Sequence, residues 1–142
     1  LEAQVTANPV NGLNILAGFS YNDSKLEKAD ADVQGRRPET ASSPYTANLW
    51  LSYRFTENIL KGLGIVFGGN YASDNKIVNS ASRGVCILPA YSVLNASLFY
   101  ETGLFRVGLK MDNLTNQHYW IGYTTVNPQQ LRSFAGTVAF QF

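Results

Sequence analysis

Few side chains in this chain are suited to catalysis. His118 is the only histidine and Cys86 the only cysteine, so the chain supplies neither a two-histidine metal site nor an internal disulfide. It also lacks a Gly-Lys-Ser/Thr phosphate loop and a Gly-x-Ser-x-Gly nucleophile elbow. Asp30 and Asp32 could touch a cation, although a solvated charged loop explains the pair more simply. We therefore expect no enzyme activity, no cofactor and no bound metal.

Large aromatic side chains are better candidates, and they indicate binding. Tyr119, Trp120 and Tyr123 place three large aromatic side chains in the segment 113–131, which suits a flat or chelated ligand. An interfacial aromatic belt, or packing within a loop, would explain the same cluster. We expect the segment 113–131 to project outward and Asn113 and Asn116 to shape its start, because Asn tolerates turn conformations.

These residues need a scaffold, and the chain alternates apolar with small or polar side chains along seven segments. The segments are residues 1–7, 13–22, 46–55, 63–71, 93–100, 105–112 and 132–142. The last one places Phe134, Val138, Phe140 and Phe142 on a single face. Most segments have about the nine to eleven residues that a tilted membrane-spanning strand needs, and none shows a helical period. The pattern predicts an all-β, antiparallel meander of about seven transmembrane strands.

The connections between these segments alternate in length. Residues 8–12, 56–62 and 101–103 form short links, whereas residues 23–45, 72–90 and 113–131 form long ones. Outer-membrane β-barrels have short periplasmic turns and long extracellular loops. A soluble sandwich has no reason to sort its loops in this way. The sorting therefore indicates a bacterial outer-membrane protein.

Composition agrees with a barrel. Charged residues make up 15% of the chain, against about a quarter in a typical soluble domain. The formal net charge of +1 gives no electrostatic reason to expect nucleic acid as a partner. No run approaches the ~20 apolar residues of a membrane helix, and a barrel strand needs none because it presents only half of its side chains to lipid.

The alternation also predicts which side chains face outer-membrane lipid. On the convex, lipid-facing side we expect Leu49, Leu51, Tyr53, Phe67, Leu109, Val138 and Phe140. On the opposite face we expect Trp50, Asn48, Arg54, Asn70, Arg106 and Lys110. An Arg or Lys facing lipid at mid-bilayer costs ~2–4 kcal/mol, which fixes the assignment.

Seven is an awkward number of strands for a complete barrel. Bacterial single-chain barrels close with an even number, and hydrocarbon does not tolerate unpaired strand edges. We therefore expect residues 1–142 to form one segment, the C-terminal part of a larger barrel.

Several motifs carry a resemblance to a known family. Asn113-Leu114-Thr115-Asn116 followed by Tyr119-Trp120, the stretch from Leu88 to Asn95, and Arg132-Ser133-Phe134 with the terminal Phe142 resemble motifs near the C-terminus of TonB-dependent outer-membrane receptors. The turn 11–14 and the segment 45–55 resemble the siderophore-receptor branch, near the ferrichrome and ferrioxamine receptors. Two features depart from the pattern: residues 129–131 separate Pro128 from Arg132, and Gly136 is displaced from its usual spacing.

The resemblance implies a 22-stranded barrel with an N-terminal plug domain in its lumen, of which this chain would form the C-terminal portion. It implies uptake of a ferric siderophore, energised by the TonB complex through the plug. Tyr119, Trp120, Tyr123 and Trp50 would then contact ligand. The inward cations Arg54, Arg106 and Lys110 would pair with plug carboxylates or attract an anionic chelate.

The resemblance also implies that Phe140 and Phe142 close the barrel and are read by the barrel-assembly machinery. Two alternatives remain at this point. One is a small complete outer-membrane barrel with a structural or adhesive role, which would need an eighth strand. The other is a soluble β-barrel or sandwich that binds a small lipid. The sequence does not identify the ligand.

Overall fold

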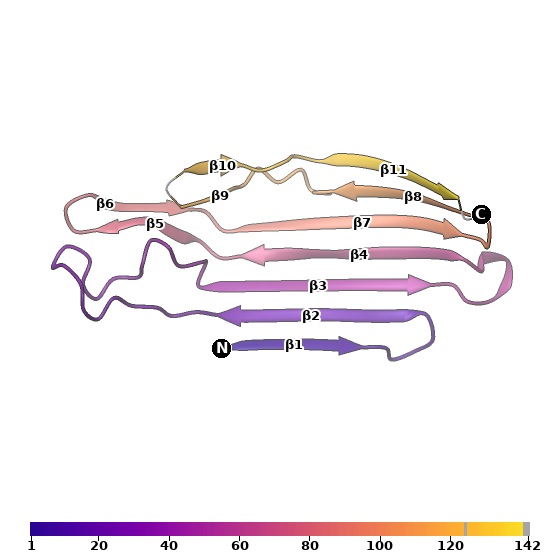
Figure 1. Cartoon of the computed structure of the whole chain (residues 1–142), viewed down its shortest axis with the longest axis horizontal. Helices are drawn as coiled ribbons and strands as arrows, with labels where there is room; N and C mark the ends of the chain where they lie inside the picture. The colour runs from indigo at the N-terminus through magenta and orange to yellow at the C-terminus, as the bar shows by residue number, and fades with distance from the viewer. Residues whose placement is uncertain (124, 141–142) are drawn as a thin grey trace.

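The computed structural model describes residues 1–123 and 125–140. Its main element is a 7-stranded sheet in which every neighbouring pair is antiparallel. In spatial order the strands are β1 (Glu2–Ala7), β2 (Leu13–Tyr21), β3 (Tyr45–Arg54), β4 (Leu63–Ala72), β7 (Tyr91–Glu101), β8 (Phe105–Asp112) and β11 (Ser133–Phe140). Figure 1 shows the strands side by side in chain order. The predicted antiparallel meander of seven strands is confirmed.

Two small hairpins extend the long connections. β5 (Asn75–Ser80) pairs with β6 (Gly84–Leu88), and β9 (Trp120–Gly122) pairs with β10 (Val126–Pro128). Both hairpins lie within the long links 72–90 and 113–131, where no strands were expected. Within the described residues the helical structure is the short 3₁₀ turn Asn58–Leu60, and no helix there is long and apolar enough to cross a membrane.

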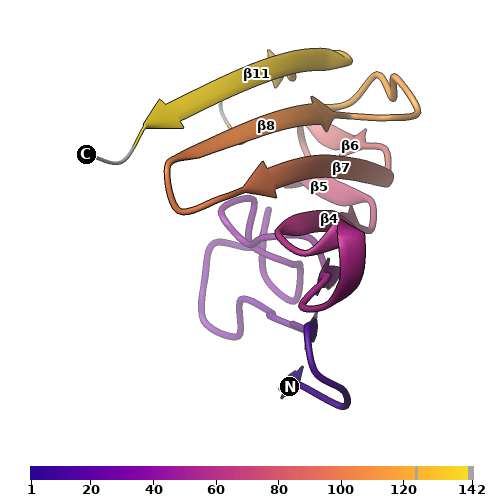
Figure 2. The same ribbon diagram turned by 90° about the vertical axis from the view of Figure 1, so that its right-hand side faces the viewer.

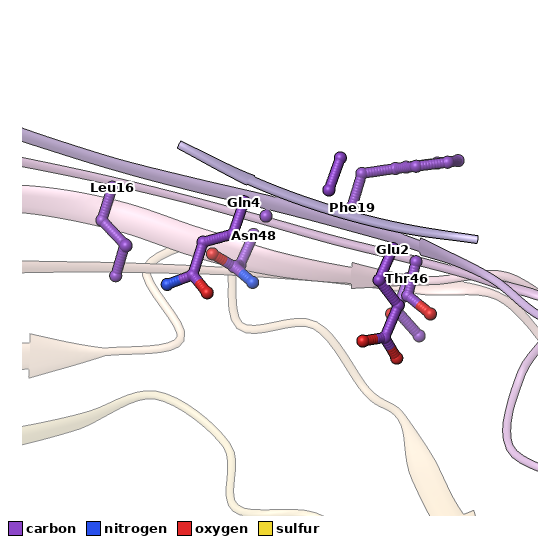
Figure 3. Close-up of a pocket in the computed structure, with 9 residues that line it drawn as sticks. Glu2, Gln4, Leu16, Phe19, Thr46 and Asn48 are labelled. Carbon is purple, nitrogen blue, oxygen red and sulfur yellow. The ribbon is translucent and has the colours of Figure 1, made fainter. Parts of the chain in front are cut away.

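The register confirms the predicted faces of the sheet. Ile15, Leu51 and Phe67 are directly opposite one another across β2, β3 and β4, and this row continues through Ala96 and Met111. We call this side the apolar face and the other side the polar face. Figure 3 shows Gln4, Leu16 and Asn48 directed to the polar side and Phe19 to the apolar side.

The sheet is curved, with β1 and β11 at opposite ends of the arc (Figure 2). The polar face is the concave one (Figures 2 and 3). The apolar face is exposed: Leu109 and Val138 are each 63% accessible and Phe140 is 66% accessible. A soluble protein would bury such a face against a second layer, whereas a membrane-spanning sheet presents it to lipid.

Two of the three short turns, residues 8–12 and 56–62, share one construction. Gly12 has a φ of +84° and Gly62 a φ of +91°, which favour glycine over other residues. The carbonyl of Gly12 accepts a hydrogen bond of 2.8 Å from the Arg54 amide, and that of Gly62 accepts one of 2.9 Å from the Glu101 amide. A Cβ on either glycine would lie 2.2 Å from the carbonyl oxygen of that same Arg or Glu. Each turn is thus packed against the end of the next long strand in the sheet.

Candidate ligand-binding rim and inner face

The candidate site lies at one end of the sheet. All three long connections, including both small hairpins, emerge at this end, and the short turns lie at the other (Figure 1). The connection 113–131 projects beyond the ends of β8 and β11 as predicted. We call this end the rim.

Asn113 fixes the start of the last rim connection. Its side chain is 2% exposed, and its φ is +53°. Its Oδ1 accepts a 2.8 Å hydrogen bond from the Gln117 amide, and its Nδ2 donates to the carbonyls of Gln117 at 2.9 Å and Gln130 at 3.2 Å. Asn116, also at φ +53°, accepts a 3.0 Å hydrogen bond from the Arg132 amide. The predicted role of both asparagines in shaping the strand exit is confirmed.

A hollow of about 440 Å³ opens beside this asparagine, and its walls combine aromatic rings with amides. Tyr119 packs against Tyr91, with ring centroids 4.5 Å apart and planes tilted by 33°. Asn70, Asn95 and Gln129 also line the hollow. The pairing orients Tyr119 toward β7, and the amides supply hydrogen-bonding groups next to a flat apolar surface. Such a combination suits a ligand with polar edges and flat faces.

The other two rings of the predicted cluster lie elsewhere on the rim. Trp120 begins β9, opposite Pro128 of β10, and Tyr123 follows β9. They are 41% and 44% exposed, and Ile121 between them is 42% exposed. In the part of the chain that the structure describes, Trp120 and Tyr123 make no ring-to-ring contact with each other or with Tyr119, whose ring packs on Tyr91. The structure thus separates a half-buried Tyr119 from two exposed rings.

Trp50 is distant from the rim connection. It lies midway along β3 on the polar face, between Leu16 of β2 and Gly68 of β4. A Cβ on Gly68 would lie 2.6 Å from Cε3 of the Trp50 ring, so only glycine leaves room for the indole there. Trp50 is therefore a packed element of the inner face, separate from the rim aromatics.

The predicted inward cations lie on the polar face, and carboxylates of this chain accompany them. Glu101 lies between Arg54, at 3.5 Å, and Arg106, at 3.8 Å. The Arg106 guanidinium also lies 4.7 Å from the centre of the Phe99 ring, within the range of a cation–π contact. Lys110 pairs with Asp112 at 3.0 Å. The side chains of the three cations remain between 49% and 58% exposed, so they are accessible to a further partner.

The first rim connection is clasped to the β5–β6 hairpin, which sequence reading did not anticipate. The Asp32 carboxylate accepts hydrogen bonds from the Ser82 amide at 2.7 Å and the Ser82 hydroxyl at 3.1 Å. Glu39 accepts from the Asn79 amide at 3.1 Å and pairs with Arg83 at 2.7 Å. These partners are more than 35 residues apart in the sequence, so no local pattern reveals them.

Hydrogen bonds from Ser80 and Ser82 lower the pKa of Asp32 from its ordinary value. This carboxylate therefore helps to hold the first rim connection against the β5–β6 hairpin. Neither Asp30 nor Asp32 belongs to a cluster able to hold a metal ion within the described residues.

Four further residues named in the sequence analysis remain to be placed. Phe140 ends β11 on the apolar face, and Phe142 lies outside the described residues. Cys86 is exposed on β6. His118 lies in the rim connection, where its carbonyl accepts a 3.2 Å hydrogen bond from Gln117.

Comparison with known proteins identifies a family model and two relatives that match most of this chain. A family model described as "TonB dependent receptor-like, beta-barrel" matches residues 1–114. The ferrioxamine receptor of Yersinia enterocolitica is 27% identical over 110 residues, which cover 78% of this chain and 14% of that receptor. The ferrichrome outer membrane transporter/phage receptor of Escherichia coli K12 is 28% identical over 116 residues, covering 80% of this chain and 14% of the transporter. The chain therefore spans only a small part of the length of these relatives.

Solved structures share the fold of the sheet. The ferric-catecholate import receptor Fiu from E. coli K12 superposes with a TM-score of 0.81 at 19% identity, covering 99% of this chain and 20% of the receptor. The ferripyoverdine receptor of the outer membrane of Pseudomonas aeruginosa gives a TM-score of 0.80 at 18% identity, covering 99% and 19%. Since the family model spans most of the sequence and the strands follow the same path, this chain belongs to the TonB-dependent receptor-like β-barrel family.

Proposed function

We propose that this chain forms the C-terminal portion of the barrel of an outer-membrane receptor that imports ferric siderophores with energy from the TonB complex. The match of residues 1–114 to the TonB-dependent receptor barrel carries the proposal. The two relatives named above, a ferrioxamine receptor and a ferrichrome transporter, support the ligand class. Transport, with no catalytic step, agrees with the scarcity of reactive side chains in the sequence.

The rim hollow beside Tyr91 and Tyr119 is the proposed ligand contact of this segment. A ferric siderophore exposes both carbon groups and polar oxygen and nitrogen groups, and the hollow offers ring faces beside the Asn70 and Asn95 amides. Trp120 and Tyr123 lie on the same connection with exposed rings, where they either contact the chelate or anchor the barrel at the interface.

The cations of the polar face are the proposed contacts to a plug domain. Arg54 and Arg106 share a single carboxylate, Glu101, so this group of three carries a net positive charge. A carboxylate on a plug surface would complete the pairing and orient the plug against β3 and β8. Lys110, already beside Asp112 at 3.0 Å, contributes less to such a contact.

Uptake of iron-loaded siderophores by cells tests the proposal. A strain that lacks the gene encoding this chain should lose uptake of one ferric siderophore while it grows normally on free iron salts. The hydroxamates ferrichrome and ferrioxamine are the first to test, given the relatives. Restoring the gene should restore uptake. If the deletion left uptake of every tested siderophore, haem and cobalamin unchanged, the transport proposal would be wrong.

A further inference from the structure

A second hollow, of about 420 Å³, lies on the polar face where β1, β2 and β3 adjoin (Figure 3). We call it the wall hollow. Gly18 lies within it, and a Cβ at this position would lie 2.7 Å from Nδ2 of Asn48, so the glycine leaves room for the Asn48 amide. The side chains that line the hollow on the polar face are mostly polar, and they are Glu2, Gln4, Leu16, Ser20, Thr46 and Asn48.

Glu2 gives the wall hollow a negative charge. Of the described residues that line the hollow, Glu2 alone has an ionisable side chain. Within the same described residues, no Lys or Arg nitrogen lies within 4.0 Å of its carboxylate. Figure 3 shows the side chains of Glu2, Gln4 and Asn48 directed to the same side of the sheet. A carboxylate beside neutral amide and hydroxyl oxygens suits an ammonium group, which has three donors and no acceptor.

The wall hollow lies near the rim and beside the rim hollow. Glu2, Ser20 and Thr46 form a row across β1, β2 and β3, one residue from the rim ends of β2 and β3. In the next row toward the turns, Asn48 is directly opposite Asn70, which lines the rim hollow. The cations proposed to contact the plug lie toward the short turns, at the other end of the polar face. The position of the wall hollow therefore favours a ligand over the plug as its occupant.

We propose that the wall hollow binds a protonated primary amine on a flexible arm of the ferric chelate. The body of the chelate occupies the rim hollow, and the arm reaches past Asn70 and Asn48 to the wall hollow. The ammonium donates to the Glu2 carboxylate and to neighbouring amide or hydroxyl oxygens. Leu16 offers an apolar contact to the carbons of the arm. The inference rests on the proposed siderophore function and narrows the ligand to hydroxamate chelates that carry an amine.

Two ligands that differ only in this amine test the site: ferric ferrioxamine B, whose chain ends in a primary amine, and its N-acetyl derivative. Calorimetric titration of the purified full-length receptor should give about fivefold higher affinity for the amine, the upper end of what an exposed ion pair contributes. Glu2→Gln should abolish this preference by lowering affinity for the amine alone. Thr46→Val, which removes a hydroxyl and keeps the shape, should reduce the preference about twofold. The control Glu57→Gln removes the same charge from an exposed position in the second short turn and should retain the preference.

Four other results would overturn the assignment, and they are distinguishable. A Glu2→Gln receptor that retains the fivefold preference would refute the role of this carboxylate. An equal loss of affinity for both ligands, with a lower melting temperature, would show that Glu2 holds the barrel or the plug instead. Equal affinity of the unmodified receptor for both ligands would refute the amine site and leave the transport proposal intact. If neither ligand bound the unmodified receptor, the hydroxamate ligand class would be wrong, and this inference with it.

Discussion

Replacing Asn113 by alanine should release the last rim connection without unfolding the sheet. The side chain of Asn113 holds Gln117 through two hydrogen bonds and Gln130 through a third. It is 2% exposed, so water does not replace these bonds while the connection stays folded. The backbone amide of Asn113 bonds to Asn95 and is unaffected by the change.

The expected cost comes from two sources. Three side-chain hydrogen bonds at about 0.5–1.5 kcal/mol each amount to about 1.5–4.5 kcal/mol. The φ of +53° adds about 1 kcal/mol for alanine, which tolerates left-handed backbone less well than asparagine. Asn113→Gly removes the same bonds and relieves the backbone term. The order of stability of the connection should therefore be Asn, then Gly, then Ala.

Hydrogen exchange measures this directly. The Gln117 amide donates to Asn113 and the Gln129 amide donates to the Tyr119 carbonyl at 3.0 Å, so both should be protected in the unmodified receptor. If they exchange through opening of the connection, Asn113→Ala should speed exchange at Gln129 at least tenfold, since 1.4 kcal/mol is one factor of ten. Asn127→Ala, at an exposed position of β10, is the control. Unchanged protection at Gln129 in Asn113→Ala would refute the argument that this asparagine holds the connection.

Further predictions concern other parts of the sheet and rim. Trp120→Ala should lower the melting temperature and leave siderophore affinity unchanged if the ring is an interfacial anchor, as we expect; a tenfold loss of affinity with unchanged melting would identify a ligand contact instead. Gly68→Ala should destabilise the receptor by about 1–3 kcal/mol in chemical denaturation because its Cβ would lie 2.4 Å from a backbone oxygen, whereas Gly136→Ala, with its nearest atom at 3.8 Å, should stay within about 0.5 kcal/mol. The clasp made by Asp32 should be fully present above its ordinary pKa of 3.8 and weaken as the pH falls through the lowered value; Asp32→Asn should abolish this dependence in the exchange rate of the Ser82 amide.

Side-chain alternation was sufficient to predict the sheet because one face of a membrane-spanning strand must be apolar to contact lipid, while the other face can be polar. Arg54 and Arg106 cannot face hydrocarbon without cost, so their position fixes the parity of β3 and β8. The pairing of the neighbouring strands can then be predicted from the short turns, because connections of this length join only antiparallel strands. Asn113 and Asn116 were predictable for a similar reason, since few residue types tolerate the backbone of a strand exit.

The rim could not be predicted in the same way. The β5–β6 hairpin has a register shift between Lys76 and Val78, which breaks the alternation that identifies longer strands. Asn79 and Ser80 are buried there, at 4% and 1% exposure, under a connection that precedes them by some forty residues. In the sequence, a segment whose polar residues are buried by distant partners cannot be distinguished from an exposed loop. The three aromatic residues lie on the rim connection as expected, but the sequence did not indicate that Tyr119 packs on Tyr91 of another strand.

The polar face divides into two zones that fit different tasks. Toward the short turns, Phe99 fills the space left by Gly64, and Arg106 lies over its ring beside Glu101. Toward the rim, Asn48 and Asn70 face each other across β3 and β4. A flat, charged lower zone suits a rigid protein surface such as the proposed plug, because ring and guanidinium planes are already fixed by their neighbours. The amides of the upper zone suit a ligand that must bind and then leave, since neutral hydrogen bonds cost less to break than ion pairs. In the proposed transport, a ligand that moves from the rim to the turns would therefore pass first the amides and then the charged groups.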